Sequence, residues 1–329
     1  MKYRTLGKTG FSVSEISLGA WQIGGGWGEP FDDAVAEKTI NAAIDAGVTF
    51  IDTADVYDGG RSERAVARVV KSRSEDVRVA TKVGRKFKPH VSESYTLEGV
   101  AAFVDANLKN MDVEKLDLVQ LHCPPTEVYY RPEIFEALDR LKAAGKILQY
   151  GVSVEKVEEA LKASEFPGVA SVQIIFNVFR QRPAEILFDI LRQRDVGVIV
   201  RVPLASGLLS GKFTRTSTFG EKDHRTFNRH GEAFDQGETF GGVDYNTGVD
   251  AVDELKRDLA HGDATLAQLA LRWILMFDAV SCVIPGASRA EQALDNVRAS
   301  DLPALTDEQM AAARSVYEKR IKPLVHHRW

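Results

Sequence analysis

The stretch from Gly47 to Tyr57 reads GVTFIDTADVY and places a short apolar run directly before a polar loop. Apolar and β-branched residues from Thr49 to Thr53 predict a buried strand. The segment before it, Ala34 to Ala46, carries its apolar residues on one helical face, and Gly47 is typical of the residue that follows a helix. A helix that leads into a buried strand indicates an α/β fold.

The same alternation continues along the rest of the chain. Apolar, β-branched runs separated by amphipathic segments predict eight strands, at Glu15 to Gly19, Thr49 to Thr53, Val77 to Val83, Leu116 to His122, Ile147 to Ser153, Ser171 to Asn177, Gly197 to Pro203 and Ser281 to Gly286. Eight parallel strands joined by right-handed crossovers close naturally into a (β/α)8 TIM barrel. We therefore expect residues 1–329 to form one such barrel as a single domain.

Two regions depart from this regular pitch. Near the start, Tyr3 to Leu6 and Phe11 to Val13 flank Gly7 to Gly10, which predicts a β-hairpin that caps the amino-terminal end of the barrel. After the seventh strand, the segment from Ser206 to Asp263 has few apolar residues, and loops of that length commonly act as functional lids. Within it, apolar residues at helical spacing from Val249 to Leu259 predict one amphipathic helix.

Composition argues against several classes of protein. The net charge of -5 disfavours nucleic acid or an anionic membrane surface as the main partner, so we expect a small-molecule partner. The first residues lack the apolar run of a secretory signal, and no stretch approaches the length of a membrane span, so we expect a cytoplasmic protein. Cys123 and Cys282 form no motif typical of a zinc site or a disulfide framework, and we expect no metal. The oligomeric state stays open.

Four polar residues fall at the carboxyl ends of neighbouring predicted strands, where chemistry takes place in this fold. Asp52, Lys82 and His122 lie at the ends of the second, third and fourth strands, and Tyr57 follows Asp52 by five residues. Taken singly, each has a structural explanation, such as a helix cap for Asp52 or a snorkelling side chain for Lys82. An acid, a phenol, an ammonium and an imidazole on one rim favour a single site instead.

These four side chains suit the reduction of a carbonyl group. A phenol has a pKa of about 10 and donates its proton poorly near neutral pH, but a nearby ammonium lowers that pKa, and Lys82 is placed to do this for Tyr57. A lysine inside a barrel mouth needs a carboxylate partner, which Asp52 can supply. His122 can then donate a hydrogen bond that orients a carbonyl oxygen. The set predicts a general acid, Tyr57, beside an external hydride donor.

Longer motifs around these residues resemble the aldo-keto reductase superfamily, and in particular a bacterial branch similar to potassium-channel β subunits. The motifs are GVTFIDTADVY, Ala80 to Lys82, Leu116 to His122, Tyr150 to Ser153, Pro203 to Lys212 and Ile284 to Ser288. The resemblance implies reversible reduction of an aldehyde or a ketone to an alcohol, with a catalytic tetrad of Asp52, Tyr57, Lys82 and His122. It also implies that NADPH, in preference to NADH, binds in an extended form across the barrel mouth.

The same resemblance assigns further residues to the cofactor and the substrate. Ser153 and Gln173 would hold the nicotinamide carboxamide, and Trp21 would line the substrate pocket together with Tyr57 and His122. The pyrophosphate would be bordered by Pro203, Leu204, Ser206 and Leu208, and the adenosine end by Gly286, Ser288, Arg289, Gln292 and Asn296. Arg289 could pair with a 2′-phosphate, which is the reason to favour NADPH.

Three positions depart from the family's pattern. Val154 stands where many members have Asn, so one carboxamide contact is missing or replaced. Arg201, which we also assign to the cofactor site, stands where an aromatic ring commonly stacks on the nicotinamide. Its guanidinium can stack in the same way, or it can pair with a carboxylate in the barrel mouth. Gln292 stands where many relatives have a basic residue.

Two other functions stay open at this point. A module that binds NADP(H) to sense redox state, with little turnover, would need the cofactor residues but not an intact tetrad. A hydrolase or an aldolase with Lys82 as Schiff-base nucleophile would leave Tyr57 and Asp52 without roles. The substrate is not identified, because specificity belongs to the segment from Ser206 to Asp263, the loop from Cys123 to Pro132 and the tail.

Overall fold

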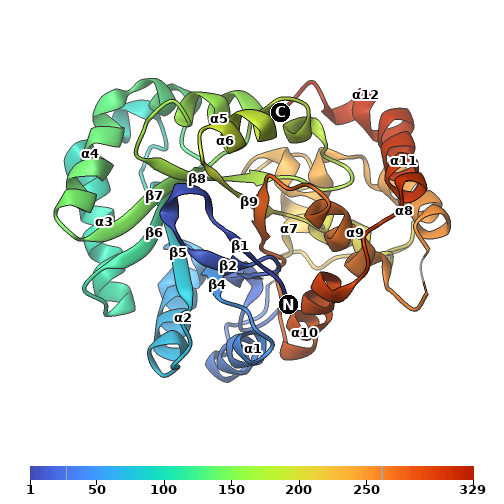
Figure 1. Cartoon of the computed structure of the whole chain (residues 1–329), viewed down its shortest axis with the longest axis horizontal. Helices are drawn as coiled ribbons and strands as arrows, with labels where there is room; N and C mark the ends of the chain where they lie inside the picture. The colour runs from blue at the N-terminus through green and yellow to red at the C-terminus, as the bar shows by residue number, and fades with distance from the viewer. Residues whose placement is uncertain (27, 261) are drawn as a thin grey trace.

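A closed barrel of parallel strands forms the centre of the computed structural model, which describes residues 1–26, 28–260 and 262–329. Its strands are β3 (Leu18–Gly19), β4 (Phe50–Asp52), β5 (Arg78–Val83), β6 (Leu116–His122), β7 (Ile147–Ser153), β8 (Val169–Ile175), β9 (Gly197–Arg201) and β10 (Val280–Val283). Each strand pairs with the next one in the chain. Parallel bridges from Ile16 to Val283 and from Gly19 to Gly286 join the last strand to the first, so the expected barrel is confirmed (Figure 1).

Helices surround the barrel on its outer face (Figure 1). Those that connect or follow barrel strands are α1 (Asp33–Asp45), α2 (Arg61–Lys71), α3 (Leu97–Met111), α4 (Pro132–Ala143), α5 (Val157–Ala163), α6 (Leu187–Gln193), α9 (Leu266–Leu275) and α10 (Ala290–Val297). Helices α1 and α10 pack against each other beside the closure between β3 and β10. The remaining helices are α7 (His224–Phe227) and α8 (Tyr245–Asp258) after β9, and α11 (Asp307–Val316) and α12 (Lys322–Val325) in the tail.

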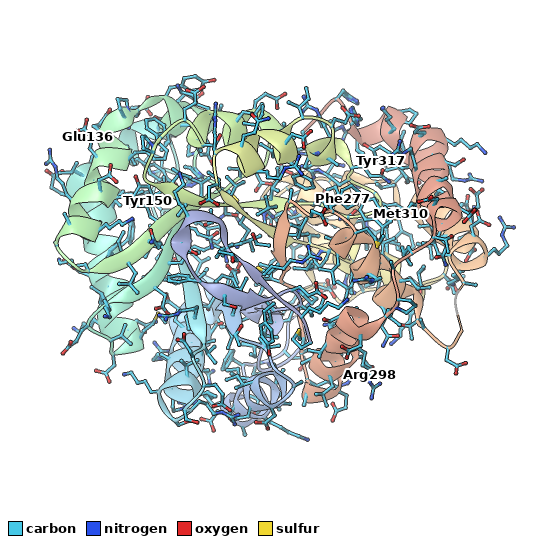
Figure 2. The ribbon with its side chains drawn as sticks, viewed as in Figure 1. Glu136, Tyr150, Phe277, Arg298, Met310 and Tyr317 are labelled. Atoms are coloured by element: carbon cyan, nitrogen blue, oxygen red, sulfur yellow. The ribbon has the colours of Figure 1, made fainter. Side chains whose placement is uncertain are left out.

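Two groups of buried apolar side chains form the core. One lies between the strands and the helices, where the ring of Phe277, labelled in Figure 2, packs on that of Phe176 with centroids 4.9 Å apart. The other joins barrel residues such as Phe50 to Leu6 and Phe11 of the amino-terminal hairpin. Burial of these side chains is the main force that stabilises the fold.

The hairpin predicted at the start of the chain is confirmed as β1 (Tyr3–Thr5), which pairs antiparallel with β2 (Ser12–Ser14). Between them, a Cβ on Gly7 would lie 2.2 Å from the backbone nitrogen of Gly197, so only glycine permits this close approach to the barrel. Arg4 fixes the hairpin by donating to the backbone oxygens of Leu275 and Val280, both at 2.8 Å, and by pairing with buried Glu15.

Only β6 and β7 have the predicted ranges, and for β8 and β3 the reason for the difference is visible in their hydrogen bonds. β8 begins and ends two residues earlier than predicted, because Asn177 leaves the ladder: its amide donates to Val202 O at 2.8 Å and its side-chain oxygen accepts the Phe179 N–H at 2.8 Å. β3 contains only Leu18 and Gly19, because the backbone before it bonds across to β10 and not to β4. The Ser17 N–H, for example, donates to Val283 O at 2.8 Å.

The long segment after β9 contains a helix and several short helical turns. The helix predicted from Val249 is confirmed as α8, which begins earlier because the Asp244 side chain caps it by accepting the Thr247 N–H. Short helical turns, including η7 (Ala205–Ser210) and η8 (Gln236–Glu238), fold the rest of the segment over the barrel mouth; His261 lies outside the described residues. Among the described residues, no helix is long and apolar enough to cross a membrane.

Candidate active site

Lys82 is the centre of the polar cluster at the barrel mouth. It is fully buried on β5, and its ammonium donates hydrogen bonds to Asp52 Oδ1 at the end of β4, to Thr53 O at 2.9 Å and to Tyr57 Oη at 3.1 Å. Tyr57 begins the short turn that follows β4, so its phenol reaches back over the barrel toward Lys82. The structure therefore brings together Asp52, Tyr57 and Lys82 as the sequence predicted.

The charges in this cluster are strongly coupled. Burial disfavours the Lys82 ammonium, but the Asp52 carboxylate and the Tyr57 hydroxyl outweigh it and raise the pKa of Lys82. For Tyr57, burial raises the pKa and Lys82 only partly reverses this, so the net direction is opposite to the lowering that the sequence suggested. Tyr57 is therefore a protonated phenol in the resting protein, and Lys82 is charged, which suits a proton donor.

His122 completes the predicted set at the end of β6. Its ring lies edge-on to that of Tyr57, with centroids 6.0 Å apart. Burial, together with the nearby cations Arg85, Lys82 and Arg201, lowers the pKa of His122 well below its usual value, so the imidazole is neutral. A neutral imidazole offers one donor and one acceptor nitrogen, and His122 Nδ1 has no hydrogen-bond partner among the described residues.

Two glutamines hold the second oxygen of Asp52. Gln120 Nε2 donates to Asp52 Oδ2 at 3.1 Å and Gln173 Nε2 donates to the same oxygen at 2.7 Å. Sequence reasoning assigned Gln173 to the nicotinamide and missed Gln120. Because side chains alternate along a strand, Gln120 shares the inner face of β6 with His122, and this spacing is the signal that could have found it.

A cavity of about 490 Å³ runs from this cluster along the barrel mouth to α9 and α10. Asp52 of the tetrad lines it, whereas Lys82 does not. Nearly all the residues assigned to substrate and cofactor line it, namely Trp21, Tyr57, His122, Gln173, Arg201, Pro203, Leu204, Ser206, Gly286, Ser288, Gln292 and Asn296. Three others do not: Ser153 and Leu208 are buried, and Arg289 is exposed at the start of α10 with Glu291 3.8 Å away. Residues missed by sequence reasoning that line it include Lys212, His224, Arg225, Glu238, Thr265 and Gln268.

The end of the cavity at α9 and α10 suits an anionic, hydrogen-bonding ligand. The Gln292 carbonyl accepts both the N–H and the hydroxyl of Ser288, at 2.8 and 3.0 Å, which leaves its amide group to donate into the cavity. Thr265 caps the start of α9, and backbone N–H groups at a helix start favour phosphate. The Lys212 ammonium adds a positive charge to the same wall. This donor set fits the diphosphate and ribose groups of a dinucleotide.

Arg201 pairs with carboxylates in the barrel mouth, which was one of the two roles left open for it. Its guanidinium lies 2.9 Å from Glu155 Oε2 and 3.4 Å from Glu238 Oε1, and Arg85 contacts the same two carboxylates. Burial raises the pKa of Glu155, whereas the two arginines lower that of Glu238 despite its burial.

Cys123 lies beside the same cluster but does not make it a metal site. Its Sγ lies within 4.8 Å of both carboxylates, but burial raises the pKa of the thiol to about 12, and the two guanidiniums oppose a metal cation there.

Comparison with known proteins relates this chain to the aldo/keto reductases and to potassium-channel β subunits. The sequence pattern of the aldo/keto reductase family matches residues 15–318. The chain is 30% identical over 299 residues to an aldo-keto reductase of Bacillus subtilis, covering 89% of this chain and 86% of that protein. It is 28% identical over 343 residues to a probable voltage-gated potassium channel subunit beta of rice, covering 98% of each.

Two further similarities bear on the cofactor and the fold. The chain is 27% identical over 334 residues to the NADH-specific methylglyoxal reductase of Escherichia coli, covering 95% of this chain and 99% of that protein. Among solved structures, the holo form of an aldo-keto reductase from Bacillus halodurans superposes with a TM-score of 0.76 at 26% identity, covering 96% of each chain.

Proposed function

This chain belongs to the aldo/keto reductase family, and on that premise we propose that it reversibly reduces an aldehyde or a ketone to an alcohol with NADPH. The observation that carries the proposal is the 3.1 Å contact between the buried Lys82 Nζ and the hydroxyl of Tyr57, which lines the cavity that reaches α10. A phenol beside a buried ammonium can act as a general acid. It can protonate the oxygen of a carbonyl substrate while a separate donor supplies the hydride to the carbonyl carbon. A reduced nicotinamide supplies that hydride when it is bound.

The residues of the chain would act on the carbonyl oxygen. As negative charge develops on that oxygen, Tyr57 gives up its proton, and the Lys82 ammonium stabilises the phenolate that results. Asp52 keeps Lys82 charged and in place. His122, which is neutral, donates a hydrogen bond to the same oxygen. In the oxidative direction Tyr57 takes the proton from the alcohol.

The cofactor assignment rests on polar side chains that line the cavity. Gln173 would contact the nicotinamide carboxamide; Lys212 and Gln292 would contact the phosphates and the ribose. We propose NADPH because exposed Arg289 stands at the start of α10, beside the cavity wall formed by Gln292, where its guanidinium can reach a 2′-phosphate. The relative named as an NADH-specific reductase makes the nucleotide preference the first thing to measure.

The test is to titrate the protein with NADPH and NADH by fluorescence and then follow consumption of the preferred nucleotide with a panel of aldehydes and ketones. Tyr57→Phe should lower turnover by at least about a hundredfold, because general acid catalysis typically contributes that much, and should leave nucleotide affinity unchanged. Tyr3→Phe, which removes the hydroxyl of an exposed tyrosine in the amino-terminal hairpin, outside the cavity and outside the loops assigned to specificity, is the matched control. Equal turnover by wild type and Tyr57→Phe would overturn the proposed mechanism.

The similarity to a channel β subunit favours one rival function, a module that binds NADP(H) and turns over little. Tight nucleotide binding without consumption of NADPH or NADH across the panel would support that rival and overturn the reductase proposal. A borohydride-trapped adduct on Lys82 in the presence of a carbonyl substrate would instead favour Schiff-base chemistry.

A further inference from the structure

Four charged side chains, Arg85, Glu155, Arg201 and Glu238, meet at the wall of the cavity of about 490 Å³, and we call them the charge cluster. The Arg201 guanidinium lies 2.9 Å from Glu155 and 3.4 Å from Glu238. Arg85 lies 3.3 and 2.8 Å from the same two carboxylates. Water reaches little of Arg201 and the two glutamates, whose side chains are 12% exposed or less. With both carboxylates ionised the charge cluster is neutral, and a single proton gives it a net positive charge.

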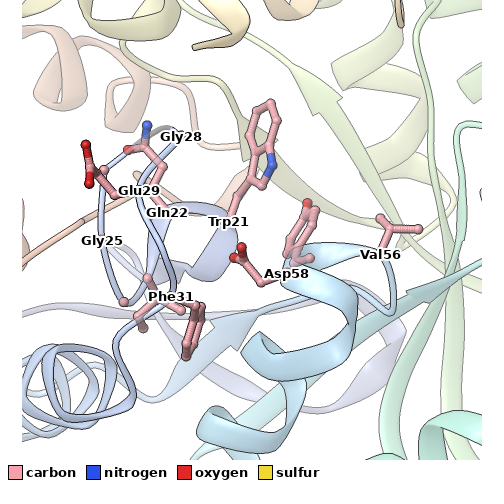
Figure 3. Close-up of a pocket in the computed structure, with 12 residues that line it drawn as sticks. Trp21, Gln22, Gly25, Gly28, Glu29, Phe31, Val56 and Asp58 are labelled. Atoms are coloured by element: carbon pink, nitrogen blue, oxygen red, sulfur yellow. The ribbon is translucent and has the colours of Figure 1, made fainter. Parts of the chain in front are cut away.

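The charge cluster lies beside the place where a nicotinamide would bind. Arg201 and Glu238 line the same cavity as Tyr57 and His122. A hydride donor has to contact the carbonyl carbon whose oxygen meets Tyr57. The smaller cavity that Tyr57 also borders, beside Trp21 (Figure 3), has a volume of about 110 Å³, which is too small for a nicotinamide with its ribose. The ring would therefore lie in the larger cavity, where the charge cluster acts on it through the wall.

The two redox states of the nucleotide differ at this end by one charge. The oxidised nicotinamide ring is a cation and the reduced ring is neutral, whereas the phosphates and the riboses are the same in both. A net positive charge behind the cavity wall weakens binding of the oxidised nucleotide in particular. The charge of the cluster thus determines the ratio of the two affinities and leaves their shared part unchanged.

Glu155 is the member of the cluster that suits reversible protonation. Burial raises the pKa of Glu155 toward neutral pH, whereas the two arginines hold the pKa of Glu238 below its usual range. Neighbouring groups keep one charge state near neutral pH. Burial raises the pKa of Tyr57 and that of the Cys123 thiol, and it lowers the pKa of His122 well below its usual value.

Charges from several elements face Glu155. They are Arg85 after β5, Glu159 in α5, Arg180 after β8, Arg201 at the end of β9, Asp235 before η8 and Glu238 in η8. The carboxylates of Glu238 and Asp235 add to the effect of burial and disfavour a negative charge on Glu155, whereas the guanidiniums oppose it. A further positive charge at the cavity wall would act in the same direction as the guanidiniums and would release the proton.

We propose that Glu155 makes the protein discriminate between reduced and oxidised nucleotide according to pH. A proton on Glu155 leaves two guanidiniums against one carboxylate, which disfavours the cationic ring, so the preference for reduced nucleotide is strongest in mild acid. When the proton leaves for the solvent, the charge cluster is neutral and the oxidised nucleotide gains affinity. By linkage, binding of oxidised nucleotide releases this proton. The inference rests on the proposed reductase function, because it needs a nicotinamide in the larger cavity.

The experiment measures the dissociation constants of NADPH and NADP+ from pH 6.0 to pH 8.5, by NADPH fluorescence and by its displacement with NADP+. The ratio of the NADP+ constant to the NADPH constant should fall roughly tenfold as pH rises, because unit charges about 10 Å apart in a protein interact by that much. Titration of the 2′-phosphate cancels in this ratio, since both nucleotides carry it. If the protein prefers NADH, the pair is NADH and NAD+. Glu155→Gln, which keeps the shape and removes the charge, should hold the ratio at its acid value throughout.

Glu158→Gln is the matched control, because it neutralises an exposed carboxylate that pairs with Arg182 on α5, outside both cavities. Its ratio should follow pH as in wild type. A ratio that is flat with pH in wild type, or that varies equally in wild type and Glu155→Gln, would contradict the inference.

A second measurement needs no variant. Calorimetry of wild type at pH 7 in buffers of different ionisation enthalpy should show more proton release on binding NADP+ than on binding NADPH. Equal release would overturn the role of Glu155 even if Glu155→Gln does not fold. Failure of the proposed function reads differently, because then neither NADPH nor NADH is consumed with any carbonyl compound, whatever the ratio of affinities.

Discussion

Gln120 shows how single residues hold the tetrad in its working state. Its amide and that of Gln173 both donate to Asp52 Oδ2, while Asp52 Oδ1 accepts from Lys82. All of these side chains are buried, and a buried carboxylate is stable only when its oxygens are paired and hydrogen-bonded. Because both amides are neutral, they satisfy the carboxylate without competing with the Lys82 ammonium for its charge.

Residue-scale prediction from the sequence succeeded where chemistry and strand position coincided. Asp52, Lys82 and His122 were found because each stands at the carboxyl end of a predicted strand. The partners of Arg201 could not be found in this way. Glu155 and Glu238 lie far apart in the chain and meet only because the segment after β9 folds back over the barrel mouth, a contact that no local pattern encodes.

His122 should make the protein less stable in acid. Its lowered pKa keeps the imidazole neutral in the folded state, whereas an unfolded histidine binds a proton below about pH 6.5. Acid therefore favours the unfolded state, by up to about 1.4 kcal/mol per pH unit below that value. Urea unfolding at pH 7.5 and pH 5.5 should show a drop in unfolding free energy about 1 kcal/mol larger for wild type than for His122→Gln. Equal drops would contradict this.

At the scale of elements, the amino-terminal hairpin should contribute strongly to stability through one side chain. Arg4→Met removes the hydrogen bonds to Leu275 O and Val280 O and leaves buried Glu15 without its cation. We expect the free energy of unfolding to fall by about 3 kcal/mol, measured in guanidinium chloride. Lys2→Met, which changes an exposed side chain two residues earlier, is the control and should have little effect. A loss below about 1 kcal/mol would show that the hairpin is held by its apolar residues instead.

Most elements of the barrel were predictable because buried strands and amphipathic helices leave different periods in the sequence. The boundaries of these elements were less predictable. The end of β8 is set by side-chain hydrogen bonds of Asn177, and the start of β3 by backbone bonds to β10. The helical turns between Ser206 and α8 also escaped, because their stability comes from contacts with distant residues: Ser206 Oγ, for instance, donates to Glu238 O at 2.8 Å.

At the scale of the whole molecule, the closure between β3 and β10 is a thin seam. Across the closure, the amides of Ser17, Gly19 and Val283 donate backbone hydrogen bonds at 2.8 to 3.0 Å, whereas β6 and β7 pair along nearly their full length. Local opening starts where few hydrogen bonds must break together. Amide hydrogen exchange should therefore be faster at Ser17 and Gly19 than at Val119 and Leu121 in β6. Slower or equal exchange would mean that the packing of α1 on α10 closes the seam firmly.

The seam also determines how the protein would fail on warming. β4, whose last residue is Asp52, meets the seam strand through the pairs Leu18 with Ile51 and Gly19 with Asp52. Opening at the seam would thus loosen the carboxylate that anchors Lys82 before the rest of the barrel melts. Heat inactivation would then begin at a temperature below the calorimetric transition and would reverse on cooling. Activity would thus be lost, and recovered, while most of the barrel stays folded.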